Sequence, residues 1–278
     1  MRLRRLGAAV SLYSVGELLK GVAVRAGADA PVKTTRKSLP QAMSLAEAVS
    51  IAGTLGKPSK MPGYSYGLDA RKCHRGSVMH LVPGSICYGC YALTDFYLTW
   101  RAADRGRERR EAGLEHPRWV DSMVRQIDHY CVGESSYFRW HDSGDLHSVE
   151  HLSRIVEVCE RTPQVKHWLP TREYEMVAEH RRRRGAFPAN LTVRLSALMI
   201  DAEPPRALPG LEVPEGAIVI PPELWDLPTS TVHTPGAPNP VEGRWSVECR
   251  AAEERANKCG PCRSCWSPRA ANISYPEH

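Results

Sequence analysis

Alternating apolar and polar stretches between residues 135 and 221 predict a regular series of strands and helices. Strands are predicted at 136–140, 164–172, 190–200 and 216–221, and helices at 147–162 and 173–184. Strands that alternate with helices in this way form parallel sheets with right-handed crossovers. We therefore expect an α/β fold, and specifically a partial (β/α) barrel.

The part of the chain before this series predicts a separate helical region. Apolar residues between Leu12 and Val22 recur at helical spacing, and Ser44 with Glu47 forms a capping-box pattern that opens a second helix. A Gly/Pro/Lys-rich break follows at 56–63. We expect residues 1–56 to be a helical N-terminal extension and residues 57–278 to be the main domain, with further helices at 93–111 and 117–131.

Composition and charge narrow the class of protein. The 278 residues are 42% hydrophobic and carry a formal net charge of +6, which is typical of a folded protein that tolerates a nucleic-acid partner. Glu17 and Lys20 interrupt the apolar stretch that a secretory signal would need, and no apolar run is long enough to span a membrane. We expect a cytoplasmic protein with no membrane partner.

Polar residues collect at the carboxyl ends of the predicted strands, the edge where parallel α/β folds bind ligands. His141 and Asp145 are candidate proton carriers, although Gly144 and Asp145 are also typical of a strand-to-helix turn. The expected ligand-binding residues are Ser143, Gly144, Asp145, Thr171, Arg172, Arg194 and Ser196.

The nine cysteines fall into two classes. Cys131 and Cys159 lie in apolar helical contexts and are expected in the core. The other seven are candidate metal ligands, because two C-x-x-C motifs far apart in the sequence, one extended to C-x-x-C-x-x-C, are typical of metal sites. They are Cys73, Cys87, Cys90, Cys249, Cys259, Cys262 and Cys265.

The consecutive spacing of Cys259, Cys262 and Cys265 favours a [4Fe–4S] cluster over zinc, which remains the alternative metal. The fourth cysteine that a ferredoxin sequence carries after such a triplet is absent here, so the fourth ligand must come from elsewhere. Seven thiols would serve one closed cluster and one open cluster. They would equally serve a single cluster held between the early pair and the late triplet, and this is the arrangement we expect, with the terminal segment folded back to the barrel mouth.

Several segments resemble the gene product 88-like family of actinobacteriophage proteins. The resemblance is carried by "SKMPGYSYGLDARKC", "GSICYGCYAL", "YFRWHDSGD" and "KCGPCRSCW" with the terminal "NISYPEH". It covers most of residues 57–278, and we expect the first 56 residues to lie outside it. The resemblance implies a phage-encoded protein that acts in the host cytoplasm.

More distantly, "CYGCYA" followed by a series with "SGD" at a strand end is similar to radical-SAM proteins. That likeness implies an open [4Fe–4S] cluster on Cys87 and Cys90 at the mouth of a partial barrel, and S-adenosylmethionine at Ser143–Asp145. The first cysteine of that family's motif falls at Pro83, so Cys73 or a late cysteine would have to replace it.

Two functions follow from these patterns. The first is a radical-SAM-like or other redox enzyme with one or two [4Fe–4S] clusters. The second is a non-catalytic iron–sulfur or zinc protein, in which metal closes the chain and a basic surface binds nucleic acid or a host protein. The arginine-rich segments at 101–110 and 181–184 are the candidates for that surface.

Overall fold

A parallel sheet of seven strands organises the protein. The computed structural model describes residues 43–94, 99, 101–204, 220–237, 246–251 and 257–277. The chain divides into two units, Met1–Gln41 and Ala42–His278, and the second unit holds the sheet. Its strands are β1 (Tyr64–Tyr66), β2 (Tyr137–Trp140), β3 (Lys166–Thr171), β4 (Leu191–Ser196), β5 (Thr229–His233), β6 (Ser246–Glu248) and β7 (Asn272–Pro276).

The strands are ordered β1-β2-β3-β4-β5-β7-β6, and each neighbouring pair is parallel. From β1 to β5 the order in space follows the order in the chain, with no reversal. Registers such as Arg139 opposite Trp168 and Leu195 opposite Thr229 align the strands so that their carboxyl ends meet at one edge. The expected α/β fold is confirmed.

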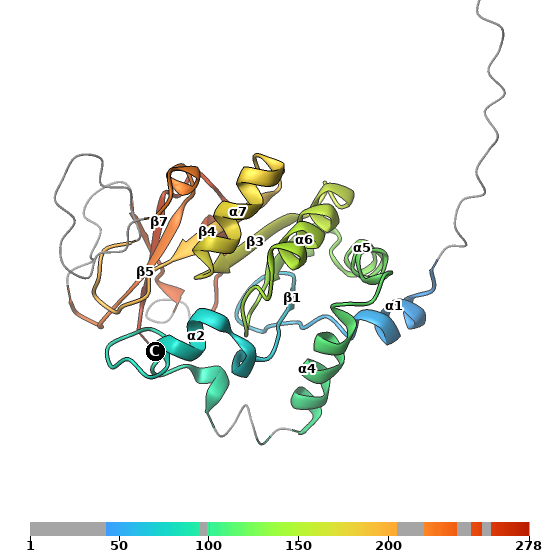
Figure 1. The fold of residues 1–278 in the computed structure, drawn as a ribbon, viewed down its shortest axis with the longest axis horizontal. Coiled ribbons are helices and arrows are strands. Elements are labelled where there is room, and N and C mark those ends of the chain that lie inside the picture. The colour runs from blue at the N-terminus through green and yellow to red at the C-terminus, as the bar shows by residue number, and fades with distance from the viewer. Residues whose placement is uncertain are drawn as a thin grey trace, which may run out of the picture. The chain divides into compact units, whose positions relative to one another are not determined.

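Helices cover one face of this sheet. The α-helices of the described residues are α1 (Leu45–Ala52), α2 (His74–Met79), α4 (Arg101–Gly113), α5 (Trp119–Tyr130), α6 (Val149–Arg161) and α7 (Tyr174–Arg184). Figure 1 shows α5, α6 and α7 side by side along the sheet. None of the described helices has the length and apolar character needed to cross a membrane.

The core lies between the sheet and these helices. Side chains alternate across a strand, so Phe138 and Trp140 of β2 face the helices with Leu169 of β3 and Val193 and Leu195 of β4. The helices contribute the buried positions that the sequence predicted for 147–162, among them Leu152, Ile155 and Cys159. Cys131 is also buried in this core, so the expected place of both non-ligand cysteines is confirmed.

The opposite face of the sheet is more polar. It presents Arg139 of β2, Trp168 of β3, and Thr192, Arg194 and Ser196 of β4. The terminal segment covers part of this face, because Trp266 donates its indole N–H to the Phe138 carbonyl and accepts from the Thr192 hydroxyl through its own carbonyl. We call this surface the inner face.

The sequence predicted the middle of the fold better than its flanks. The strands β2, β3 and β4 and the helices α6 and α7 are confirmed. The capping residue Ser44 accepts from the Glu47 amide at 3.1 Å, which confirms the predicted start of α1. The predicted helix near 12–22 and most of the predicted strand at 216–221 lie outside the described residues, and β1, β5, β6 and β7 were not predicted.

The helix α1 packs with the main domain. The buried Gln126 of α5 donates its amide to the Gly53 carbonyl at 3.0 Å, and Arg118 pairs with Glu47 at 2.5 Å. The first contact joins a residue before position 56 to α5, and the second joins α1 to the start of α5, within the unit that holds the sheet.

Candidate functional site

A cavity of about 430 Å³ opens where the carboxyl ends of the strands meet the inner face. One wall is formed by the loop and helix that follow β1, and the opposite wall by the ends of β2, β3, β4 and β5. The residues on these walls that carry chemistry include Cys73, Cys87, Cys90, His141, Arg172 and Ser196. This is the edge of the sheet at which the sequence predicts ligand binding.

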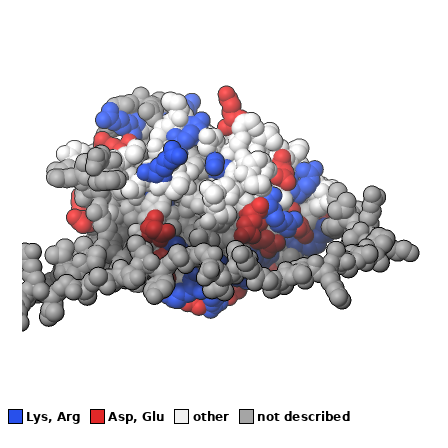
Figure 2. All heavy atoms as spheres, turned by 90° about the horizontal axis from the view of Figure 1, so that it is seen from above, with Lys and Arg blue, Asp and Glu red and all other residues white. Residues whose placement is uncertain are grey.

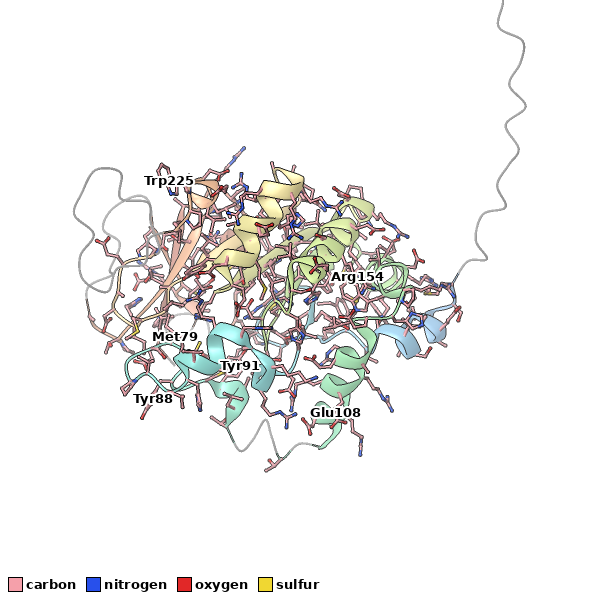
Figure 3. The ribbon with its side chains drawn as sticks, viewed as in Figure 1. Met79, Tyr88, Tyr91, Glu108, Arg154 and Trp225 are labelled. Carbon is pink, nitrogen blue, oxygen red and sulfur yellow. The ribbon has the colours of Figure 1, made fainter. Side chains whose placement is uncertain are left out.

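The early cysteines come together on one wall of this cavity. Cys73 immediately precedes α2, and Cys87 and Cys90 lie in one turn in which the Cys90 amide donates to the Cys87 carbonyl at 3.2 Å. His80 at the end of α2 holds that turn, since its Nδ1 lies 3.0 Å from the Cys87 carbonyl and donates to it. Tyr91, labelled beside α2 in Figure 3, donates its hydroxyl to the Asp142 carbonyl and so fastens the loop to the end of β2.

Gly76 packs closely against two of these cysteines. A Cβ atom at Gly76 would lie 3.5 Å from Cys73 Sγ, 3.9 Å from Cys87 Sγ and only 2.8 Å from Cys73 Cβ. Any larger residue at this position would therefore crowd Cys73 and reach the Cys87 thiol.

Burial favours the protonated form of two of these thiols. Burial raises the pKa of Cys73 well above its ordinary value, and the neighbouring Asp145, Cys90 and Cys87 raise it further. The pKa of Cys87 is also raised by burial, although the Arg172 guanidinium opposes the shift. Buried thiols whose ionised form is disfavoured in this way are suited to a cation that neutralises them.

The polar side chains of the "SGD" turn at the end of β2 mainly form hydrogen bonds within the protein. Asp145 is buried, and its carboxylate accepts from the Leu146 amide at 2.8 Å, the Thr171 hydroxyl at 2.6 Å and the Arg172 amide at 2.9 Å. Burial nevertheless raises the pKa of Asp145 above its ordinary value. The carboxylate joins the ends of β2 and β3, while Ser148 caps α6.

The other two residues of this turn also make structural contacts. Ser143 donates its hydroxyl to the Leu68 carbonyl at 2.8 Å. Gly144 has φ +78°, and a Cβ there would lie 2.7 Å from Leu68, so both its backbone angle and its packing require glycine. Ser143, Gly144 and Asp145 still line the cavity.

Among the remaining predicted ligand-binding residues, Arg172 and Ser196 line the cavity, whereas Thr171 is buried against Asp145. Arg194 corrects an expectation. Its guanidinium is fully buried and donates to the carbonyls of Thr229, Ala270, Ser267 and Ser264 at 2.8–3.4 Å. Arg194 therefore anchors the terminal segment and does not line the mouth of the site.

Of the two candidate proton carriers, His141 is the one whose polar side-chain atoms are not already used in hydrogen bonds to described residues. It lines the cavity with φ +54°, a backbone angle that is uncommon outside glycine, and neither ring nitrogen has a hydrogen-bond partner among the described residues. Burial holds its pKa well below the ordinary value, so the ring is neutral. The centroid of the His151 ring lies 5.5 Å from that of His141, and the centroid of the His147 ring lies 5.8 Å from that of His151.

The late cysteines form a second group. Burial raises the pKa of Cys259 and of Cys265, and the neighbouring Cys249 raises both further, as Cys262 does for Cys259. The Cys249 amide donates to the Ser274 carbonyl of β7, and the Cys259 amide donates to the Lys60 carbonyl, both at 2.8 Å. Four thiols from two separate segments thus lie near one another beside β7.

This grouping corrects the expected shared site. The early thiols are neighbours of one another, and the late thiols of one another, so the terminal segment folds onto the inner face and does not complete the early turn. All nine cysteines lie in the described part of the chain, and none forms a disulfide. Across the same residues, no three His, Cys, Asp or Glu side chains converge as they would around a single metal ion.

Residues that sequence reasoning missed link the two groups. Arg139, Trp168 and Tyr275 line the cavity from the inner face. The signal available for Arg139 was its place two residues before His141 on a strand whose alternate positions face the core. Tyr275 lies in a strand that the sequence did not predict.

Three of the four arginines at 181–184 are paired with acids. Arg181 pairs with Asp226, Arg182 lies 2.6 Å from Glu179, and Arg183 lies 3.4 Å from Glu150. Figure 2 shows basic and acidic residues interspersed on the face that it presents.

The comparisons with known proteins give one result. No curated protein and no solved structure matches the chain. The family model described as gene product 88 matches residues 33–268. This match begins well before position 57, so the segment from residue 33 onward, which we expected to lie outside the family, is part of it. Because the match spans most of the sequence, the chain belongs to the gene product 88 family.

Proposed function

We propose that this protein is an iron–sulfur redox protein with two [4Fe–4S] sites of different character. Cys73, Cys87 and Cys90 would hold a cluster with one iron open to the cavity, and the four late cysteines would hold a closed cluster. The observation that carries the proposal is the convergence of three thiols, from two separate segments, on one wall of a cavity of about 430 Å³.

The residues present fit such clusters in their chemistry. Thiolates are the usual ligands of iron–sulfur clusters, and Cys73, Cys87 and Cys90 all line the cavity. The consecutive spacing of Cys259, Cys262 and Cys265 favours a four-iron cluster over a zinc ion, which usually takes its ligands as two separated pairs.

The arrangement also favours an active site over a purely structural one. Strand order follows chain order from β1 to β5, and the early cysteine loop follows β1, as expected for a partial (β/α) barrel of the radical-SAM type. When bound, the open cluster would supply an electron to a molecule in the cavity. His141, Arg172 and Ser196 would contact that molecule, for which S-adenosylmethionine is our first candidate.

The same proposal places the protein in the cytoplasm, where thiols remain reduced. The alternative function, a metal-stabilised protein that binds nucleic acid or a host protein, has less support because Arg181, Arg182 and Arg183 are ion-paired within the protein.

Anaerobic purification followed by iron, zinc and acid-labile sulfide analysis tests the proposal. We expect about eight iron and eight sulfide per chain, because each of the two clusters contains about four of each. Cys87→Ala and Cys262→Ala should each retain about half of the iron, because each variant disrupts one group. Stoichiometric zinc without sulfide would overturn the cluster assignment, and a reduced EPR signal unaffected by S-adenosylmethionine would overturn that choice of ligand.

A further inference from the structure

An arginine without a counter-ion lies on the inner face of the cavity. Arg139 is partly buried, yet its side chain forms no hydrogen bond or ion pair with any described residue, and its Nε–H is buried without an acceptor. Its guanidinium stacks on the Trp168 ring, 4.7 Å from the ring centroid. This stacking orients the guanidinium but does not neutralise its charge.

Three acids line the cavity, Asp142, Asp145 and Glu277, and none of them forms an ion pair with Arg139. The carboxylate of Asp145 is used by Leu146, Thr171 and the Arg172 amide. Asp142 accepts from the Ser65 hydroxyl at 2.9 Å. Removing a cation from water without a partner is costly, so a protein that retains one in a cavity usually supplies the partner from outside.

A second guanidinium lies on the same cavity wall. Arg172 uses its Nε–H to donate to the Ala197 carbonyl at 3.0 Å and forms no ion pair in the described part of the chain. Its hydrogen bond fixes the side chain at the end of β3, while Arg139 is fixed on β2. Guanidinium groups are the side chains best suited to carboxylates and phosphates, and this cavity is lined by two of them.

We propose that this cavity binds a small anionic molecule through its carboxylate or phosphate group, held by Arg139 together with Arg172. The inference goes beyond the iron–sulfur proposal and does not depend on it, because neither arginine is a metal ligand. A volume of about 430 Å³ is the size of a small-molecule site. The anion enters the cavity with its charged group toward the inner face, which leaves the rest of the molecule toward the early cysteines.

Calorimetric titration of the full-length protein tests this, with iron and sulfide measured on the same preparation. The probes are inorganic pyrophosphate, S-adenosylmethionine and decarboxylated S-adenosylmethionine. We expect saturable binding of pyrophosphate if the natural group is a phosphate, and tighter binding of S-adenosylmethionine than of its decarboxylated form if it is a carboxylate. In Arg139→Gln the affinity for the bound probe should fall at least about tenfold, the loss of one charge-assisted contact.

The matched control is Arg184→Gln. It removes the same charge from an exposed position at the end of α7, and it should leave the affinity unchanged. If Arg139→Gln does not fold, Arg139→Lys keeps the charge but not the planar pair of donors, and it should bind severalfold more weakly than the wild type.

Two results would overturn the inference: no saturable binding of any probe to the wild type, or equal affinity in the wild type and the folded Arg139 variant. A loss of iron beside equal affinity would assign Arg139 to the late thiols, since its charge opposes the rise that burial causes in the pKa of Cys259. Absence of iron from every preparation would refute the iron–sulfur proposal alone and leave this comparison intact.

Discussion

The hydroxyl of Tyr275 lies 3.2 Å from the sulfur of Cys265, and the same tyrosine lines the cavity that holds the early cysteines. Tyr275 is partly buried, and burial raises its pKa well above the ordinary value, so its hydroxyl keeps its proton. A tyrosine in this position would donate to the Cys265 thiolate of a loaded late site. It connects the late group physically with the cavity.

Replacing Tyr275 with phenylalanine should therefore change the late site without removing it. Hydrogen bonds to cluster sulfurs raise the reduction potential because they stabilise the more negative, reduced form. We expect Tyr275→Phe to retain its iron while one of two reduction midpoints, followed by EPR during redox titration, moves to more negative potential. Tyr88→Phe, at an exposed tyrosine, is the control, and identical midpoints in all three proteins would show that Tyr275 does not contact a cluster ligand.

Gly76 allows a test of the early site that leaves every cysteine in place. A Cβ at this position would lie 2.8 Å from Cys73 Cβ and 3.9 Å from the Cys87 sulfur. Alanine usually stabilises a helix relative to glycine by up to about 1 kcal/mol, so a loss of iron in Gly76→Ala would come from the crowding and not from a weaker helix.

We expect Gly76→Ala to lose about half of the protein's iron while its helical circular dichroism is unchanged. Gly89→Ala is a well-matched control, because Gly89 lies between Cys87 and Cys90 and a Cβ added there would have no atom within 4 Å. Full iron content in Gly76→Ala would mean that Cys73 and Cys87 do not hold a cluster next to Gly76.

The difference between what the sequence predicted and what it missed has a physical cause. The strands β2, β3 and β4 were found because their core-facing residues, such as Phe138 and Leu169, are apolar. The strand β5 is as well buried, but Thr231 is polar, and so is its neighbour Ser274 on β7. These side chains are buried because they pair across strands, as Asn272 does with Thr231 at 3.1 Å, and hydrophobic periodicity does not detect such pairs.

The candidate site shows the same limit. Residue types and spacing indicated the seven thiols, but their grouping depends on which strands are neighbours. Cys249 joins Cys259 and Cys265 because β6 and β7 are paired, and neither strand was predicted. Arg194 was assigned to the cavity mouth because it lies near a strand end in sequence, yet its side chain is directed into the terminal segment.

Arg194 should be among the residues that contribute most to stability. Its buried guanidinium supplies four backbone carbonyls, three of them in residues 264–270. Arg194→Met would leave those carbonyls without donors, and we expect the free energy of unfolding in urea to fall by at least about 3 kcal/mol. The late site should lose its iron with it. Arg184→Met, at an exposed arginine, is the control, and a loss below about 1 kcal/mol would contradict this role.

The buried ring of His167 should make the free energy of unfolding depend on pH. Its ring is fully buried against Phe138 and Trp140, and burial lowers its pKa from 6.5 to about 3. The Thr162 hydroxyl donates to the Val158 carbonyl, so it accepts from His167 Nε2, and a second proton on Nδ1 would have no acceptor. The unfolded chain binds this proton below about pH 6.5 and the folded chain does not, so stability is full above that pH and falls as the pH decreases.

The expected loss from His167 alone is about 2 kcal/mol between pH 7 and pH 5, because pH 5 lies about 1.5 units below the unfolded pKa. His167→Phe keeps an aromatic ring beside Trp140 and cannot be protonated. The difference between its unfolding free energies at pH 7 and pH 5, measured with urea, should therefore shrink by about 2 kcal/mol relative to the wild type. His129→Phe, at an exposed histidine of α5, should leave that difference unchanged. Equal pH dependence in the wild type and His167→Phe would show that His167 takes up its proton without unfolding, and that the missing acceptor at Nδ1 is supplied within the native state.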